Sequence, residues 1–139
     1  MSLANEPSTL PDERACNAKL SNREVAECLL SVAEKLNLIL PRYVEAKRAK
    51  ILRYTPADRK IDGDRADLFA IELEEAARSL ERAQASWIAY RDAHCDMIER
   101  LYLDGTGKAV GAAQCSIDLT KTRIRELWPG PSSGLPDPN

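Results

Sequence analysis

The sequence predicts an all-α fold, an elongated antiparallel bundle of three main helices held by two disulfides. Apolar residues recur at helical spacing over three long segments, and no segment alternates apolar and polar residues as a half-buried strand does. Aromatic residues make up 5% of the chain, which favours a core of aliphatic side chains. The four cysteines are even in number and widely spaced, as in a domain stapled by disulfides.

The folded domain is expected to span residues 15–128. Residues 1–14 are polar and contain two prolines, and residues 129–139 are rich in proline and glycine. Such segments are typical of disordered termini, so we predict a disordered lead-in and a disordered tail. A length of 139 residues with 44% hydrophobic residues suits a single domain.

The first helix is predicted to begin at Ser21, because Ser21 and Glu24 have the spacing of a capping box. Pro41 has no N–H to donate to the carbonyl of Asn37, so the helix is expected to kink or break there. The apolar pattern then resumes and stops before Thr55. Its first half places apolar residues near the 3.6-residue period, at Val25, Leu29, Val32, Leu36 and Ile39.

The second helix is predicted over residues 65–103, where neither glycine nor proline occurs. One unbroken helix of that length would measure about 58 Å, more than the width of a compact sphere of this mass, which favours an elongated molecule. A tight turn is predicted at residues 104–108, DGTGK. A third helix follows and ends at Trp128, with one apolar face formed by Val110, Ala113, Ile117, Ile124 and Leu127.

Hairpin geometry predicts which cysteines pair. Cys95 and Cys115 each lie ten residues from Gly105, so an antiparallel helical hairpin that turns there brings them to the same level. The remaining pair, Cys16 and Cys28, would tie the incoming segment to the first helix. Four buried free thiols are the alternative, and no Cys-x-x-Cys spacing indicates a redox or zinc motif.

Two disulfides indicate an oxidising compartment, the periplasm or the cell exterior. The N-terminus has neither the basic nor the apolar region of a signal peptide, so we expect that such a peptide has been removed.

Charge is balanced overall but unevenly placed. The formal net charge is −2, which indicates neither a nucleic-acid nor a membrane partner, and no apolar run approaches the ~20 residues of a membrane span. Residues 61–75 are acidic and could dock a cationic protein, with Asp62, Asp64 and Asp67 as candidate contacts. Residues 42–54 are basic, and an alternative docking face comprises Arg42, Lys47, Arg48 and Lys50. Both segments are also compatible with ordinary solvated helix faces.

No catalytic or cofactor motif is found. GTGKAVG lacks the register of a phosphate-binding loop, and the single histidine, His94, has no second histidine to complete a metal or catalytic set. We therefore expect no enzyme, no metal and no cofactor. Trp87 and Tyr90 could form an aromatic ligand face, but packing is the favoured role, and Arg91 is expected to make an ion pair or cap a carbonyl across the bundle.

The same residues resemble the LprI-like lysozyme-inhibitor domain family. That family combines an early pair of cysteines, a Leu-Asn motif, a Gln-x-x-Trp-x-x-Tyr-Arg-x-x-x-Cys block, a later cysteine and a Thr-x-x-Arg-x-x-x-Leu motif. Here the pattern falls over residues 15–128, on Leu36, Asn37, Gln84, Trp87, Tyr90, Arg91, Thr120, Arg123 and Leu127 together with the four cysteines.

The resemblance implies a secreted or periplasmic helical domain that acts by binding, and for some members inhibition of lysozyme. The motif residues are expected to be mainly structural. The alternative function is an envelope interaction or scaffold module with a different partner, and the oligomeric state is left open.

Overall fold

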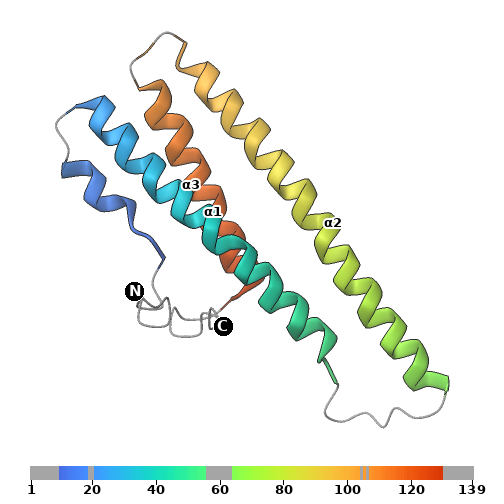
Figure 1. Cartoon of the computed structure of the whole chain (residues 1–139). Helices are drawn as coiled ribbons and strands as arrows, with labels where there is room; N and C mark the ends of the chain where they lie inside the picture. The colour runs from blue at the N-terminus through green and yellow to red at the C-terminus, as the bar shows by residue number, and fades with distance from the viewer. Residues whose placement is uncertain (1–9, 19–20, 56–63, 104, 106, 130–139) are drawn as a thin grey trace.

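The computed structural model describes residues 10–18, 21–55, 64–103, 105 and 107–129. A short 3-10 helix, η2 (Glu13–Ala18), precedes three α-helices, α1 (Asn22–Leu52), α2 (Asp64–Leu101) and α3 (Lys108–Leu127). α2 runs antiparallel to both α1 and α3 (Figure 1). No strand occurs in these ranges. The predicted all-α bundle is confirmed, whereas most of the predicted lead-in and tail lies outside the described residues.

α1 begins where its capping residues predict. The Ser21 hydroxyl accepts a hydrogen bond from the Glu24 backbone N–H at 3.1 Å and donates one to the Glu24 carboxylate at 3.0 Å. The first of these bonds satisfies a backbone donor that the first helical turn leaves free, and the second holds the Ser21 hydroxyl in place. α1 then continues without interruption through Pro41 to Leu52. The expected break at Pro41 is therefore wrong, and a bend there stays a prediction.

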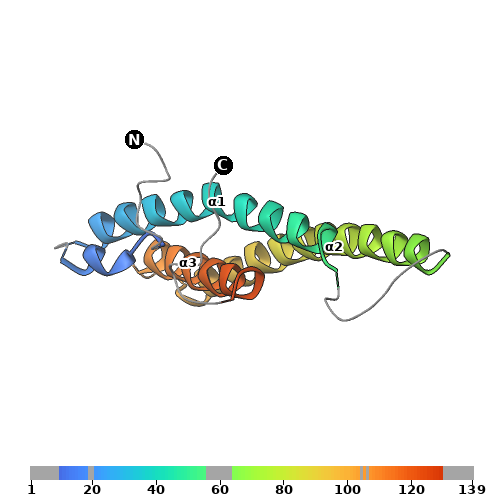
Figure 2. The same ribbon diagram turned by 90° about the horizontal axis from the view of Figure 1, so that it is seen from below.

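The bundle is elongated because α2 is long, and α3 has only about half as many residues. α2 has 38 residues and α3 has 20, which correspond to about 57 Å and about 30 Å. The C-terminal part of α1 and the N-terminal part of α2 therefore extend beyond the end of α3 (Figures 1 and 2). None of the helices in the described residues combines the length and apolar character needed to cross a membrane.

The main apolar core lies between α1 and α3. Side chains at helical spacing on α1 meet the apolar face of α3, and Leu36, Ile117 and Ile124 are essentially inaccessible. Burial of aliphatic side chains stabilises the bundle by about 1.5–3 kcal/mol for each large residue. The main buried members of this core are Leu29, Val32, Leu36, Leu40, Tyr43, Ala113, Ile117, Ile124 and Leu127.

α2 packs less completely than its apolar periodicity indicates. Leu80 and Trp87 are partly buried against the core, whereas Leu68, Ile71 and Leu101 are 62%, 55% and 68% exposed. The N-terminal part of α2 extends past α3 (Figure 1), so Leu68 and Ile71 lack the third helix that would cover them. Helical spacing places residues on a face, but another element must lie opposite before that face is buried.

The 3-10 helix η2 is held by one covalent and one ionic contact. Cys16 is fully buried and forms a disulfide with Cys28 of α1, across a Cα–Cα distance of 5.6 Å. Glu13 forms an ion pair with Lys121 of α3. Burial alone would raise the pKa of Glu13, but the hydrogen bond and charge of Lys121 outweigh it, so the pKa is lowered. Any stability this pair contributes is therefore present at neutral pH and is lost as acid protonates Glu13.

Replacing Tyr43 with phenylalanine is expected to change stability at alkaline pH and leave it nearly unchanged at neutral pH. Burial raises the pKa of Tyr43 from 10.0 to about 12, so the folded state holds this proton after the unfolded state has lost it. This linkage destabilises the wild type as pH rises from about 10 to about 12, by about 2 kcal/mol at the upper end.

Urea unfolding of wild type and Tyr43→Phe across that pH range measures the effect. The variant should lose less stability than the wild type. Parallel loss in both proteins would contradict a buried, neutral phenol at this position.

Candidate functional site

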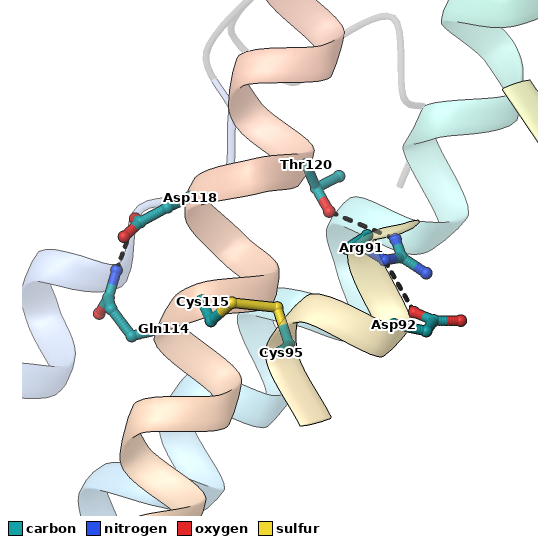
Figure 3. The surroundings of a disulfide bond; sticks show 7 residues. All are labelled: Arg91, Asp92, Cys95, Gln114, Cys115, Asp118 and Thr120. Carbon is teal, nitrogen blue, oxygen red and sulfur yellow. Dashed lines mark hydrogen bonds and ion pairs between the residues drawn. A yellow bond between two sulfur atoms is a disulfide. The ribbon is translucent and has the colours of Figure 1, made fainter. Parts of the chain in front are cut away.

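Arg91 joins the three helices at one level. Its side chain extends from α2 and is 9% exposed. Its Nη1 donates hydrogen bonds to Asn37 Oδ1 of α1 at 2.6 Å and to Thr120 Oγ1 of α3 at 3.3 Å. Its Nε donates to Asp92 at 3.0 Å (Figure 3). A planar guanidinium with five donors suits this position, because a buried charge is tolerated when its donors find acceptors.

Trp87 lies against two guanidinium groups. Its ring is 5.2 Å from Arg91 and 5.9 Å from Arg123, both measured from the ring centroid to Cζ. Arg123 of α3 also donates from Nε to Gln84 Oε1 of α2 at 2.9 Å. Cation–π contacts of this kind contribute about 0.5–1 kcal/mol each, and more where water is excluded. The Arg91 contact lies within α2, whereas the Arg123–Trp87 contact and the Arg123–Gln84 hydrogen bond cross from α3 to α2 and help to fix the register of these two helices.

These contacts bring six of the nine predicted motif residues together. We call the six the interhelical polar network: Asn37, Gln84, Trp87, Arg91, Thr120 and Arg123. Leu36 and Leu127 lie in the apolar core, with exposures of 0% and 3%. Tyr90 does not join them: it is 54% exposed and stacks on His94, with 5.4 Å between ring centroids. The network supports a structural role for most of the motif.

The predicted disulfides are confirmed. Cys95 of α2 and Cys115 of α3 are bonded, with 5.6 Å between their Cα atoms, and Figure 3 shows the bridge beside Arg91. Cys16 and Cys28 form the other pair, so no cysteine is free. Cys95 is therefore part of the bundle's scaffold, and the alternative of four free thiols is wrong. The described residues contain no cluster of His, Cys, Asp and Glu that could hold a metal ion.

Residue spacing about Gly105 indicates one contact of the interhelical polar network. Trp87 and Arg123 each lie 18 residues from Gly105, as Cys95 and Cys115 each lie ten residues from it. The symmetry that predicts the disulfide therefore also places Trp87 beside Arg123. Spacing about Gly105 does not indicate the contact between Arg91 and Asn37, because Asn37 lies on α1, which is not part of the α2–α3 hairpin.

The acidic candidates are partly placed by the structure. Asp62 lies outside the described residues, and Asp64 is the first residue of α2. Asp67, Glu72 and Glu74 are exposed on α2 without an ion-pair partner in the described residues. Glu75 differs, because a hydrogen bond from Arg78 lowers its pKa and occupies its carboxylate. Asp67 and Glu74 are seven residues apart and share one side of α2; we call this pair the acidic surface.

The basic candidates are more occupied by internal contacts. Arg48 forms ion pairs with Glu45 at 3.9 Å and with Glu81 of α2 at 3.1 Å. Lys50 lies over the Trp128 ring, 5.3 Å from its centroid. Arg42 is exposed, Lys47 is half-buried, and no ion-pair partner for either lies in the described part of the chain. Two of the four basic candidates therefore already help to hold α1 against its neighbours.

A family model described as lysozyme inhibitor LprI matches residues 15–127. The chain belongs to this family. The match spans the three helices and both disulfides. Neither the curated proteins nor the solved structures contain a match to this chain. This family match agrees with the resemblance to LprI-like proteins that the Gln84–Cys95 block indicates.

Proposed function

We propose that this LprI-family protein is a non-catalytic inhibitor that binds a lysozyme outside the cytoplasm. The observation that carries the proposal is the acidic surface of an inhibitor-family domain. Asp67 and Glu74 are exposed, have no ion-pair partner among the described residues, and lie in the N-terminal part of α2. Lysozymes are cationic, so these carboxylates would accelerate encounter and orient the complex.

Both disulfides support action in an oxidising compartment. One links α2 to α3 and the other links η2 to α1, so both the hairpin and the N-terminal segment are covalently restrained. Stable disulfides of this kind are typical of secreted and periplasmic proteins, where lysozymes act.

A lysozyme activity assay tests the proposal directly. The oxidised protein is expected to inhibit a cationic lysozyme, more strongly at low than at high ionic strength because exposed charges are screened by salt. Protein that has been reduced and alkylated should lose inhibition together with its helical structure. Failure of the oxidised protein to inhibit lysozymes of several classes would contradict the proposal.

Charge reversal at the acidic surface is expected to weaken inhibition. The variant Asp67→Lys/Glu74→Lys should raise the inhibition constant about tenfold or more at low salt, the equivalent of about 1.4 kcal/mol. Glu27→Lys/Glu34→Lys is the matched control, with the same change in net charge, the same seven-residue spacing and exposed positions on α1. Equal loss in both variants would show that net charge, and not this surface, determines binding.

A scaffold module that binds through the basic face is the competing function. It predicts no effect on lysozyme, together with loss of partner binding in Arg42→Glu/Lys47→Glu. These two residues are the informative ones, because Arg48 and Lys50 have internal contacts whose loss would also change stability.

A further inference from the structure

An uncharged stripe follows one exposed side of α2. Its residues are spaced three or four apart, which aligns them on one side of a helix. All are exposed except the half-buried His94, and Tyr90, Met97 and Leu101 are 54%, 45% and 68% exposed. We call it the α2 stripe: Ala76, Ser79, Ala83, Ser86, Tyr90, His94, Met97 and Leu101.

We propose that the α2 stripe is a self-association surface, through which two copies of this chain pair α2 against α2 in antiparallel orientation. A largely exposed helix side that carries no formal charge can pack against another protein surface, and charged residues lie along one edge of this stripe.

The stripe is small in one half and large in the other. Its N-terminal half holds alanine and serine, and its C-terminal half holds Tyr, His, Met and Leu. In an antiparallel pair centred near residue 88, each large side chain faces a small one of the other copy. Ala76 faces Leu101, Ser79 faces Met97, Ala83 faces His94, and Ser86 faces Tyr90.

One register therefore satisfies four pairs at once, and the midpoint of each pair falls within about half a residue of position 88. Small residues opposite large ones let two helices approach closely and fill the space between them. A parallel pair would place large residues against large and small against small, leaving gaps at one end. A two-fold axis at residue 88 gives a closed dimer.

Charged residues along one edge of the stripe are complementary in the same register. Glu75 of one copy faces Arg100 of the other, and Arg82 faces Asp96. In an antiparallel helix pair, one edge of a helix lies against the same edge of its partner. Each of these two contacts therefore forms twice, once on either side of the two-fold axis. In the single chain all four are exposed and bonded to near neighbours, through Arg78–Glu75, Arg82–Glu75 and Arg100–Asp96. Rim pairs of this kind set orientation and register more than affinity.

The stripe is separate from the acidic surface. At about 100° per residue, Asp67 and Glu74 lie more than about 120° around the α2 axis from the middle of the stripe. A dimer would therefore leave the acidic surface of each copy accessible. Self-association and lysozyme binding are independent proposals, and each can fail without the other.

Sedimentation equilibrium of the full oxidised chain tests the dimer. The wild type should change from monomer to dimer as its concentration rises. Ala83→Arg places a charge within the stripe, opposite His94 of the other copy, in a residue that favours helix, and should raise the dimer dissociation constant about tenfold or more. Ala85→Arg is the matched control, because Ala85 is exposed on the opposite edge of α2. Wild-type monomer at every concentration, or equal weakening by both variants, would overturn the proposal.

Cysteine cross-linking tests the antiparallel register. Ser79→Cys/Met97→Cys adds two thiols about 27 Å apart on one helix, too far to bond within a chain. All four native cysteines are already bonded, so new disulfides must join the added thiols. The double variant should form covalent dimers on oxidation, whereas Ser79→Cys and Met97→Cys alone should not. Covalent dimers in either single variant would indicate a parallel pair and overturn the register.

Discussion

The substitution Arg91→Ala is expected to lower the free energy of unfolding by about 3 kcal/mol. Hydrogen bonds that involve a charged group contribute about 1.5–3 kcal/mol, and Asn37 and Thr120 would both lose their donor. The Trp87 ring would also lose the guanidinium that covers one side. Urea unfolding followed by far-ultraviolet circular dichroism measures the change, with Arg91→Lys expected to be intermediate because an ammonium lacks the planar fork.

Asp92→Ala is the matched control for that experiment. Asp92 also accepts a hydrogen bond from Arg91, but its side chain is 65% exposed, so its loss should cost less than about 1 kcal/mol. A double-mutant cycle between Arg91→Ala and Asn37→Ala should give a coupling energy of about 1 kcal/mol or more. If Arg91→Ala costs no more than Asp92→Ala, the interhelical polar network does not hold the bundle together.

Removing the Cys95–Cys115 disulfide is expected to destabilise the protein by about 3 kcal/mol. A cross-link across a separation of 20 residues restricts the unfolded chain, and the loop-closure model assigns it that magnitude. Cys95→Ala/Cys115→Ala should therefore unfold at lower urea concentration in one cooperative transition, because the bridge joins two main helices.

The second disulfide provides the comparison. Its separation is 12 residues, so loop closure predicts a similar value, close to 3 kcal/mol. However, it ties the short helix η2 to α1 and joins no pair of main helices. Cys16→Ala/Cys28→Ala should mainly increase hydrogen exchange in residues 13–18 and retain exchange protection in α2 and α3. Equal loss of hydrogen-exchange protection throughout the bundle in both variants would contradict the expectation that the Cys16–Cys28 bridge mainly stabilises η2.

Local patterns determined much of the fold in advance. The Ser21–Glu24 cap, the glycine-free segment before Gly105 and the apolar period of each helix predicted the three helices and most of their ends. Spacing about Gly105 also predicted the Cys95–Cys115 bridge, because residues equidistant from a hairpin turn meet at one level. Of the two outcomes expected at Pro41, a kink or a break, the break does not occur, since α1 continues through this residue to Leu52.

Candidate residues were harder to predict than helices. The family motif identified Arg91, Trp87 and Arg123 but not the stacked arrangement that they form. Charge composition identified a basic segment and an acidic segment, but composition does not show which charges are already paired. Arg48 illustrates this, because its partner Glu81 lies 33 residues away on another helix.

The sequence by itself determined the helices, the cysteine pairing and the register of the α2–α3 hairpin, because each depends on spacing along one continuous segment. Only the tertiary structure decided where α1 lies along that hairpin, and with it the contact of Asn37 with Arg91. It also decided that the N-terminal part of α2 extends past α3, leaving Leu68 and Ile71 exposed. The physical reason is that a helical period specifies the direction of a side chain, whereas burial and pairing depend on what packs against it.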